Sequence, residues 1–168
     1  YVTPSRLPPD AQAAIADCTA RAAAALGLRE GPVHAELRLN DAGPWLVEIA
    51  GRSIGGLCST VLEFGAGVCL EEVVLRHAVG RPLGALERGG GAAGVMMIPI
   101  PGAGLLRAVH GQDEARAVPG VTGLEITAPL HQSLVPLSEG GAYLGFIFAR
   151  ADDSATAEAA LRAAHARL

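Results

Sequence analysis

Two short segments that alternate apolar and polar residues constrain this chain more than any other feature, because a strong turn signal joins them. The turn is Asn40-Asp41-Ala42-Gly43-Pro44, and the pattern predicts a β-hairpin over residues 33–52. If Asn40 faces Pro44, Glu36 lies directly opposite Glu48. Strand side chains alternate between two faces, so one face should carry His34, both carboxylates and Arg38. The other face should be core and hold Val33, Ala35, Leu37, Leu39, Trp45, Val47 and Ile49.

Carboxylates directly opposite each other on paired strands repel, so a positive charge is expected close to Glu36 and Glu48. Arg38 or Arg52 could supply it, because each is close in sequence to one of the carboxylates. A divalent cation is the alternative, since Mg²⁺ binds carboxylate oxygens and usually substrate phosphates as well. The hairpin alone leaves both interpretations open.

Residues 33–56 resemble the catalytic hairpin of the ATP-grasp superfamily. The resemblance implies that Glu36 and Glu48 hold Mg²⁺ (or Mn²⁺) against the phosphates of ATP. It also implies that Arg52 stabilises the charge of the phosphate or acyl phosphate. Many members have an Asn as a further metal ligand where this chain has Ala50, which leaves open whether one metal or two are bound.

The loop after Arg52 reads Ser53-Ile54-Gly55-Gly56-Leu57, which is more similar to the amino-acid ligase branch than to biotin carboxylases. Adjacent glycines permit positive φ and let backbone N–H groups approach an anion, so Gly55 and Gly56 are candidate substrate-binding residues. An ordinary glycine turn is the alternative. His34 is a further candidate, either in contact with substrate or as a partner that orients Glu36.

The remaining pattern predicts helices and strands on both sides of a Gly-rich segment. Asp10 is expected to cap a helix over 11–26 that ends at Gly27, and further helices are predicted over 57–64 and 69–78. Beyond the segment, strands are predicted over 92–101, 105–110, 121–127 and 142–150. Helices are predicted over 112–117 and from a Ser154 cap to 168, with 92–101 and 105–110 as a hairpin.

The predicted fold class is α+β: the C-terminal lobe of an ATP-grasp fold (antiparallel sheet with helices), followed by a small α+β C-terminal domain. The expected boundaries are 1–80 for the lobe, 81–91 for a linker and 92–168 for the C-terminal domain. The segments 94–99, 119–121 and 141–149 resemble the C-terminal domain of the amino-acid ligase branch. In that branch this domain packs against the ATP-grasp lobe.

Composition and charge narrow the class of protein. The net charge of −4 offers no basic field for nucleic acid, and no apolar run reaches the roughly 20 residues of a membrane helix. The three cysteines lack C-x-x-C spacing, so they are interpreted as small buried residues in a reducing, cytoplasmic setting.

The resemblance implies a C-terminal fragment of an ATP-dependent carboxylate–amine ligase that forms an acyl phosphate and releases ADP. Its expected partners are a small-molecule carboxylate, an amine and the missing N-terminal lobe, because the chain has no lysine and no Gly-rich flap before the hairpin. A homodimer is left open, and we expect no turnover from this chain alone. The alternatives are a biotin-carboxylase-like enzyme that uses bicarbonate and a non-catalytic module that retains the hairpin.

Overall fold

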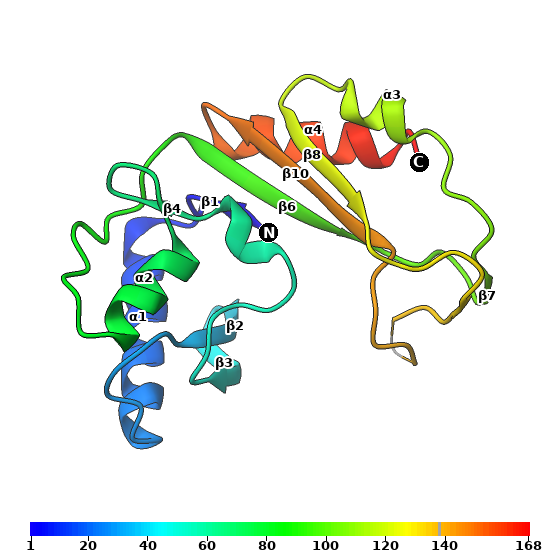
Figure 1. The fold of residues 1–168 in the computed structure, drawn as a ribbon. Coiled ribbons are helices and arrows are strands. Elements are labelled where there is room, and N and C mark those ends of the chain that lie inside the picture. The colour runs from blue at the N-terminus through cyan, green and yellow to red at the C-terminus, as the bar shows by residue number, and fades with distance from the viewer. Residues whose placement is uncertain (138) are drawn as a thin grey trace. The chain divides into compact units, whose positions relative to one another are not determined.

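The structure is a computed structural model that describes residues 1–137 and 139–168 and divides them into two compact units. We call Ser5–Gly90 the hairpin unit, and Tyr1–Pro4 together with Gly91–Leu168 the sheet unit. Figure 1 shows the elements of each. Each unit is described by itself below.

The hairpin unit begins with helix α1, Pro9–Ala25. Pro9 occupies the first turn, where its missing N–H costs nothing, so the helix starts before Asp10, and the predicted Asp10 cap is wrong. Gly27, with a φ of 72°, donates its N–H to the carbonyl of Ala24 and ends the helix as predicted.

Strands β2 (His34–Asn40) and β3 (Gly43–Ala50) follow α1 and pair antiparallel, and α1 packs against β3. The chain continues with the 3-10 turn η1 (Cys58–Val61), strands β4 (Glu63–Phe64) and β5 (Val68–Cys69), and helix α2 (Leu70–Ala78). Helix α2 confirms the prediction over 69–78. The α-helix predicted over 57–64 is wrong, because Cys58–Val61 forms only a 3-10 turn and the last two residues form the strand β4, which pairs with β5.

The Gly-rich stretch after α2 is bound to β4. Gly65 N–H donates to the carbonyl of Glu87 at 2.9 Å, and Gly89 N–H donates to the carbonyl of Glu63 at 2.8 Å. Residues up to Gly90 therefore belong to the hairpin unit. The expected linker at 81–91 stays a prediction.

The sheet unit is an antiparallel sheet in the order β1-β6-β10-β8. Its strands are β1 (Val2–Thr3), β6 (Ala92–Ile98), β8 (Val121–Ile126) and β10 (Gly145–Ala151). Helix α4 (Ser154–His165) packs against β6 and β10, and helix α3 (Gln112–Arg116) packs against β8 (Figure 1). The core lies between sheet and helices, where Val95, Ile98 and Ile147 are fully buried. These elements confirm the strands and helices predicted there, apart from the two corrections below.

The predicted hairpin of 92–101 with 105–110 is wrong. Strand β7 is only Gly104–Leu105, and it pairs with β9, Ser133–Leu134. The neighbours of β6 are instead β10 and β1, and β1 comes from the far end of the sequence. Alternation within 105–110 could not reveal these partners, because pairing between distant segments leaves no local signal.

The cap of α4 is Asp153, one residue before the predicted Ser154. Asp153 Oδ1 accepts the backbone N–H groups of Ala155 and Thr156, each at 2.9 Å. The Ser154 hydroxyl donates to the carbonyl of Pro4 at 2.6 Å, which fastens the chain before α1 to the sheet unit.

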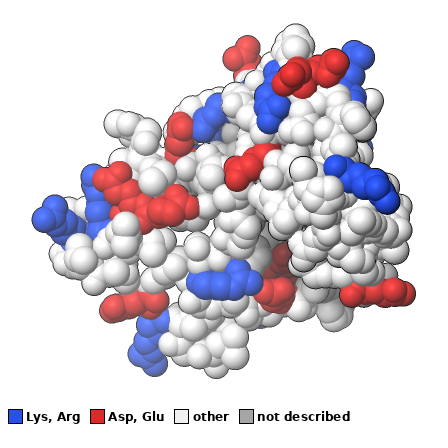
Figure 2. Space-filling view, turned by 45° about the vertical axis from the view of Figure 1, so that its right-hand side comes forward, with Lys and Arg blue, Asp and Glu red and all other residues white. Residues whose placement is uncertain are grey.

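The cysteines are not all buried as predicted. Cys58 is buried and burial raises its pKa, whereas Cys18 is half-buried and Cys69 is exposed. None of the helices in the described part of the chain is long and apolar enough to cross a membrane. Figure 2 shows acidic and basic side chains interspersed on the visible face.

We predict that Asp153→Ala lowers the melting temperature of the sheet unit, while Asp153→Asn retains most of it because the amide oxygen can still accept the N–H bonds. The backbone N–H of Thr156, foremost, lowers the pKa of Asp153. The stabilisation should therefore be complete above the ordinary Asp pKa of about 3.9 and be lost as pH falls through the lower folded pKa. Thermal melts of wild type and Asp153→Ala at several pH values measure it. If the difference in melting temperature between wild type and Asp153→Ala grew on acidification, the capping role of Asp153 would be contradicted.

Candidate carboxylate site on the hairpin

The two carboxylates are brought together by an extra residue in β3. From the turn outward, Asn40 pairs with Gly43 and Leu37 with Leu46, but the next pair is Glu36 with Glu48. Val47 is therefore the additional residue of a β-bulge. Without it Glu36 would pair with Val47 and Glu48 would point to the other face. The bulge is what makes Glu36 and Glu48 direct neighbours.

The bulge changes the composition of the two faces. Trp45 pairs with Arg38 and lies on the carboxylate face, where its Nε1 donates to Asn40 Oδ1 at 3.1 Å. The predicted core positions of Trp45 and Val47 are wrong, since these residues are 58% and 62% exposed. The opposite face instead contains Ala35, Leu37, Leu39, Pro44, Leu46 and Ile49. The prediction failed because it paired Asn40 with Pro44, one residue beyond its actual partner.

Each carboxylate has a basic partner of its own. Glu48 Oε1 accepts from Arg52 Nη2 at 3.2 Å, and Glu36 Oε1 is 3.3 Å from His34 Nε2. The side chains of Glu36 and Glu48 are 45% and 50% exposed, so solvent screens these contacts and leaves them weak. The side chain of His34 is only 14% exposed, so its ring is held in place beside Glu36.

Arg52 begins the loop that carries the two candidate glycines. Its Nη1 donates to the carbonyl of Ser53 at 2.9 Å, and a side-chain carbon at Gly55 would lie 3.9 Å from the same nitrogen. Gly56 has a φ of 63°, a conformation that glycine adopts readily. The structure therefore places Arg52 next to both Glu48 and Gly55.

The far end of this loop is fastened to α2, which the sequence did not reveal. The Ser59 hydroxyl is the leading cause of a lowered pKa at the Glu71 carboxyl, and Ser59 is buried in η1. Glu71 lies in the first turn of α2. This contact fixes the segment that follows Gly56. A serine and a glutamate twelve residues apart give no sequence signal of such a contact.

Glu36 and Glu48 fit a Mg²⁺ ion that also binds substrate phosphates. Magnesium commonly takes one or two protein carboxylates and completes its shell with water and phosphate oxygens. Over residues 1–137 and 139–168 there is no group of three or more His, Cys, Asp or Glu that could hold a metal ion. The donor set therefore suits a metal that arrives with its substrate better than a closed structural metal site.

Family models match two separate parts of the chain. Residues 1–61 match the model described as ATP-grasp domain, and residues 96–168 match the model described as L-amino acid ligase C-terminal domain 2. The first match contains His34, both carboxylates and Arg52. No curated protein matches the chain.

Solved structures share the fold. The L-amino acid ligase from Bacillus licheniformis is 26% identical with a TM-score of 0.82, and the match covers 99% of this chain and 42% of that one. N5-carboxyaminoimidazole ribonucleotide synthetase from Thermotoga maritima is 20% identical with a TM-score of 0.74, covering 99% and 44%. Biotin carboxylase from Campylobacter jejuni is 18% identical with a TM-score of 0.63, covering 99% and 38%. The chain spans less than half the length of these proteins, and its fold is the C-terminal part of theirs, as predicted.

We predict that Glu36→Gln raises the free energy of unfolding of the hairpin unit by about 0.2–1 kcal/mol when divalent metal is absent, because it removes one of two facing negative charges. Gln keeps an oxygen that can accept from His34. Urea unfolding with a chelator at low salt, followed by fluorescence of the single tryptophan, Trp45, measures the change. The matched control is Glu30→Gln, which removes a charge elsewhere in the same unit. Destabilisation by Glu36→Gln alone would show that the carboxylate is a structural ion-pair member.

Proposed function

Because this chain belongs to the ATP-grasp superfamily, we propose that it is the C-terminal part of an ATP-dependent carboxylate–amine ligase. Its substrates would be amino-acid-type molecules, and ADP would be released. The observation that carries the proposal is the pairing of Glu36 with Glu48 on one face, with Arg52 beside Glu48. The match of residues 96–168 to the amino-acid ligase model supports this branch of the superfamily.

Glu36 and Glu48 would hold Mg²⁺ (or Mn²⁺). When bound, the metal would neutralise charge on the phosphoryl group that leaves ATP. Arg52 is about half exposed, and its guanidinium can turn from Glu48 to phosphate oxygens at little cost. A planar guanidinium binds two oxygens of such a group at once, so we assign to Arg52 the stabilisation of the transferring charge.

We assign substrate binding to the loop after Arg52 and a positioning role to His34. Backbone N–H groups at Gly55 and Gly56 can approach a substrate carboxylate closely, because neither residue carries a side chain. His34 is held beside Glu36 and would fix the direction in which that carboxylate presents its oxygens. Direct contact of His34 with substrate is the alternative role.

We propose that residues outside this chain complete the nucleotide site. The chain contains no lysine, and it spans 42% of the Bacillus licheniformis ligase. The hairpin also exposes Trp45, Leu46 and Val47, which are large apolar side chains that a further part of the enzyme would cover. By itself the chain would carry metal ligands without turnover.

One observation favours a second candidate, a non-catalytic module that retains the hairpin. Ala50, which pairs with His34, stands where the resemblance implies a metal-binding Asn. A site reduced to two carboxylates would bind metal more weakly. The biotin-carboxylase-like alternative, with bicarbonate as substrate, shares the fold and has no further support in the loop after Arg52.

We predict that the longest natural polypeptide containing this chain releases ADP from Mg-ATP when pooled amino acids are supplied. Glu48→Ala should lower the rate about 100-fold or more without unfolding the protein, because it removes a charge that acts on the transferring group. The matched control is Glu30→Ala, a glutamate of the same unit outside the site, which should retain the rate.

The outcomes separate the candidates. ADP release that depends on bicarbonate and not on amino acids would replace the proposed substrates with those of the second enzyme class. A folded protein that releases no ADP with either would contradict the ligase proposal. Binding of Mn²⁺, followed by electron paramagnetic resonance in wild type and Glu48→Ala, tests the metal ligands separately from turnover.

A further inference from the structure

Four residues of β2 and β3 form a square on the carboxylate face of the hairpin. Glu36 pairs with Glu48, and at the next position on the same face His34 pairs with Ala50. Directly opposed side chains in such a sheet have Cβ atoms about 4.5–5.5 Å apart, and diagonal neighbours are about 7–8 Å apart, which long side chains can span. Ala50 contributes only a methyl group. His34 is therefore the third side chain of this square that can donate to a metal ion.

The imidazole of His34 already lies beside one of the carboxylate oxygens. His34 Nε2 is 3.3 Å from Glu36 Oε1. Neighbouring ligand atoms of a six-coordinate ion lie about 3 Å apart, because each is about 2.1 Å from the metal and they meet at a right angle. The separation therefore suits two ligands of one ion as well as it suits a hydrogen bond. The side chain of His34 is mostly buried, so its ring is largely fixed in this position.

Glu48 is engaged by Arg52 in this structure. Its Oε1 accepts from Arg52 Nη2 at 3.2 Å, and the described residues contain no assembled group of three His, Cys, Asp or Glu donors. The contact between Glu48 and Arg52 is half exposed and weak. When Arg52 turns to phosphate oxygens, as its proposed role requires, Glu48 is released to join His34 and Glu36.

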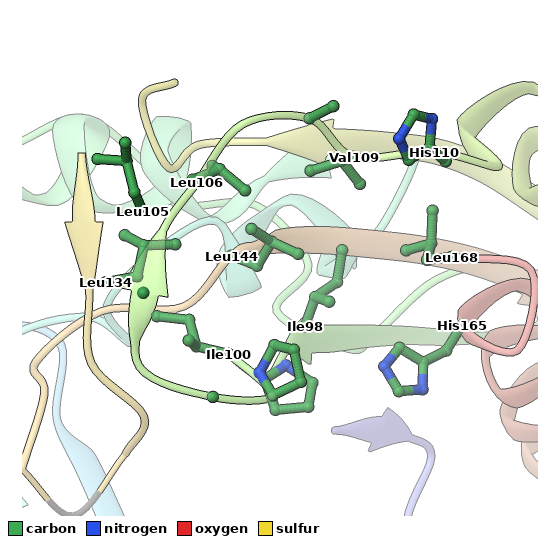
Figure 3. A pocket seen from close by; sticks show the side chains of 15 residues that line it. Ile98, Ile100, Leu105, Leu106, Val109, His110, Leu134, Leu144, His165 and Leu168 are labelled. Carbon is green, nitrogen blue, oxygen red and sulfur yellow. The ribbon is translucent and has the colours of Figure 1, made fainter. Parts of the chain in front are cut away.

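Two histidines of the sheet unit have no such carboxylate in the pocket that they line. This apolar pocket has a volume of about 490 Å³, and Figure 3 shows His110 and His165 on opposite sides of it with Leu168 between them. Among the described residues that line it, none is an aspartate or a glutamate. A cation would find no negative charge there, which distinguishes these two histidines from His34.

We propose that His34 Nε2 is a ligand of the same divalent ion as Glu36 and Glu48. The role rests on the proposed function, in which the two carboxylates hold the ion, and it is more direct than the orientation of Glu36. Mg²⁺ prefers oxygen ligands, whereas imidazole is a common ligand of transition-metal ions. The hairpin should therefore favour Mn²⁺ over Mg²⁺ more strongly than two carboxylates alone would.

Pulsed electron paramagnetic resonance of Mn²⁺ bound to the longest natural polypeptide containing this chain tests the proposal. Inorganic triphosphate supplies the phosphate oxygens, because it contains no nitrogen of its own. An imidazole bound to Mn²⁺ gives a nitrogen modulation of the electron spin echo, whereas a histidine that only orients Glu36 does not. The expected result is this modulation in the wild-type protein.

Variants assign the signal to His34. His34→Gln should abolish the nitrogen modulation, measured at a Mn²⁺ concentration that restores occupancy, and should weaken Mn²⁺ binding about tenfold or more. Displacement of Mn²⁺ by Mg²⁺ should become easier in the same variant. The matched control is His77→Gln, a histidine on α2 in the same unit, which should change none of these results. Thermal melts show whether each variant is folded, and His34→Asn replaces His34→Gln if that variant does not fold.

The modulation decides between a ligand and a positioning residue, because loss of a residue that orients a ligand also lowers metal affinity about 10–100-fold. Bound Mn²⁺ without nitrogen modulation, or a modulation that persists in His34→Gln, would overturn the assignment of His34 and leave the ligase proposal intact. Mn²⁺ that fails to bind the wild-type protein, or that binds Glu48→Ala equally well, would contradict the metal ligands of the proposed function together with His34. The two failures are therefore distinguishable.

Discussion

The candidate site depends on one extra residue in a strand. The turn fixes the register near Asn40, because Asn40 Oδ1 accepts the N–H of Ala42 at 2.9 Å and Gly43 adopts a φ of 108°. In that register Glu36 and Glu48 would lie on opposite faces. The extra residue Val47 shifts the register by one residue, which brings Glu36 and Glu48 onto the same face. A chain that places two like charges side by side in this way gains nothing from their contact, which is why we interpret the bulge as part of a binding site.

The sequence predicted the Glu36–Glu48 pair through two errors that cancelled. Pairing Asn40 with Pro44 was wrong by one residue near the turn, and the unforeseen bulge restored the same register beyond it. Between the turn and the bulge the one-residue error in register remained. The predicted register therefore places Trp45 in the core, although it is exposed. Periodicity predicts alternation along one strand, but a single inserted residue exchanges the faces without changing the apolar pattern.

Helices and strands that follow from the local sequence pattern were predicted well. Contacts between segments distant in the sequence were not. Helix α2 and strands β6, β8 and β10 follow from the spacing of apolar residues, and Gly27 ends α1 because its conformation suits glycine. The pairing of β1 with β6 joins segments about ninety residues apart, as the bond from Tyr1 to Val95 shows. The contact of Ser59 with Glu71 and the approach of Gly111 to Arg167 likewise depend on the folded structure alone. The candidate carboxylates could therefore be named from sequence, whereas contacts between distant segments could not.

The candidate carboxylate site is only loosely held within its own unit. The carboxylates of the hairpin are about half exposed, are held by weak ion pairs and face each other with the same charge. In the proposed function, a cation and its phosphate ligands would turn this into a favourable arrangement. Under the proposed function, the metal, the nucleotide and its phosphates would be positioned by the rest of the enzyme, and the hairpin would supply the two carboxylates and Arg52.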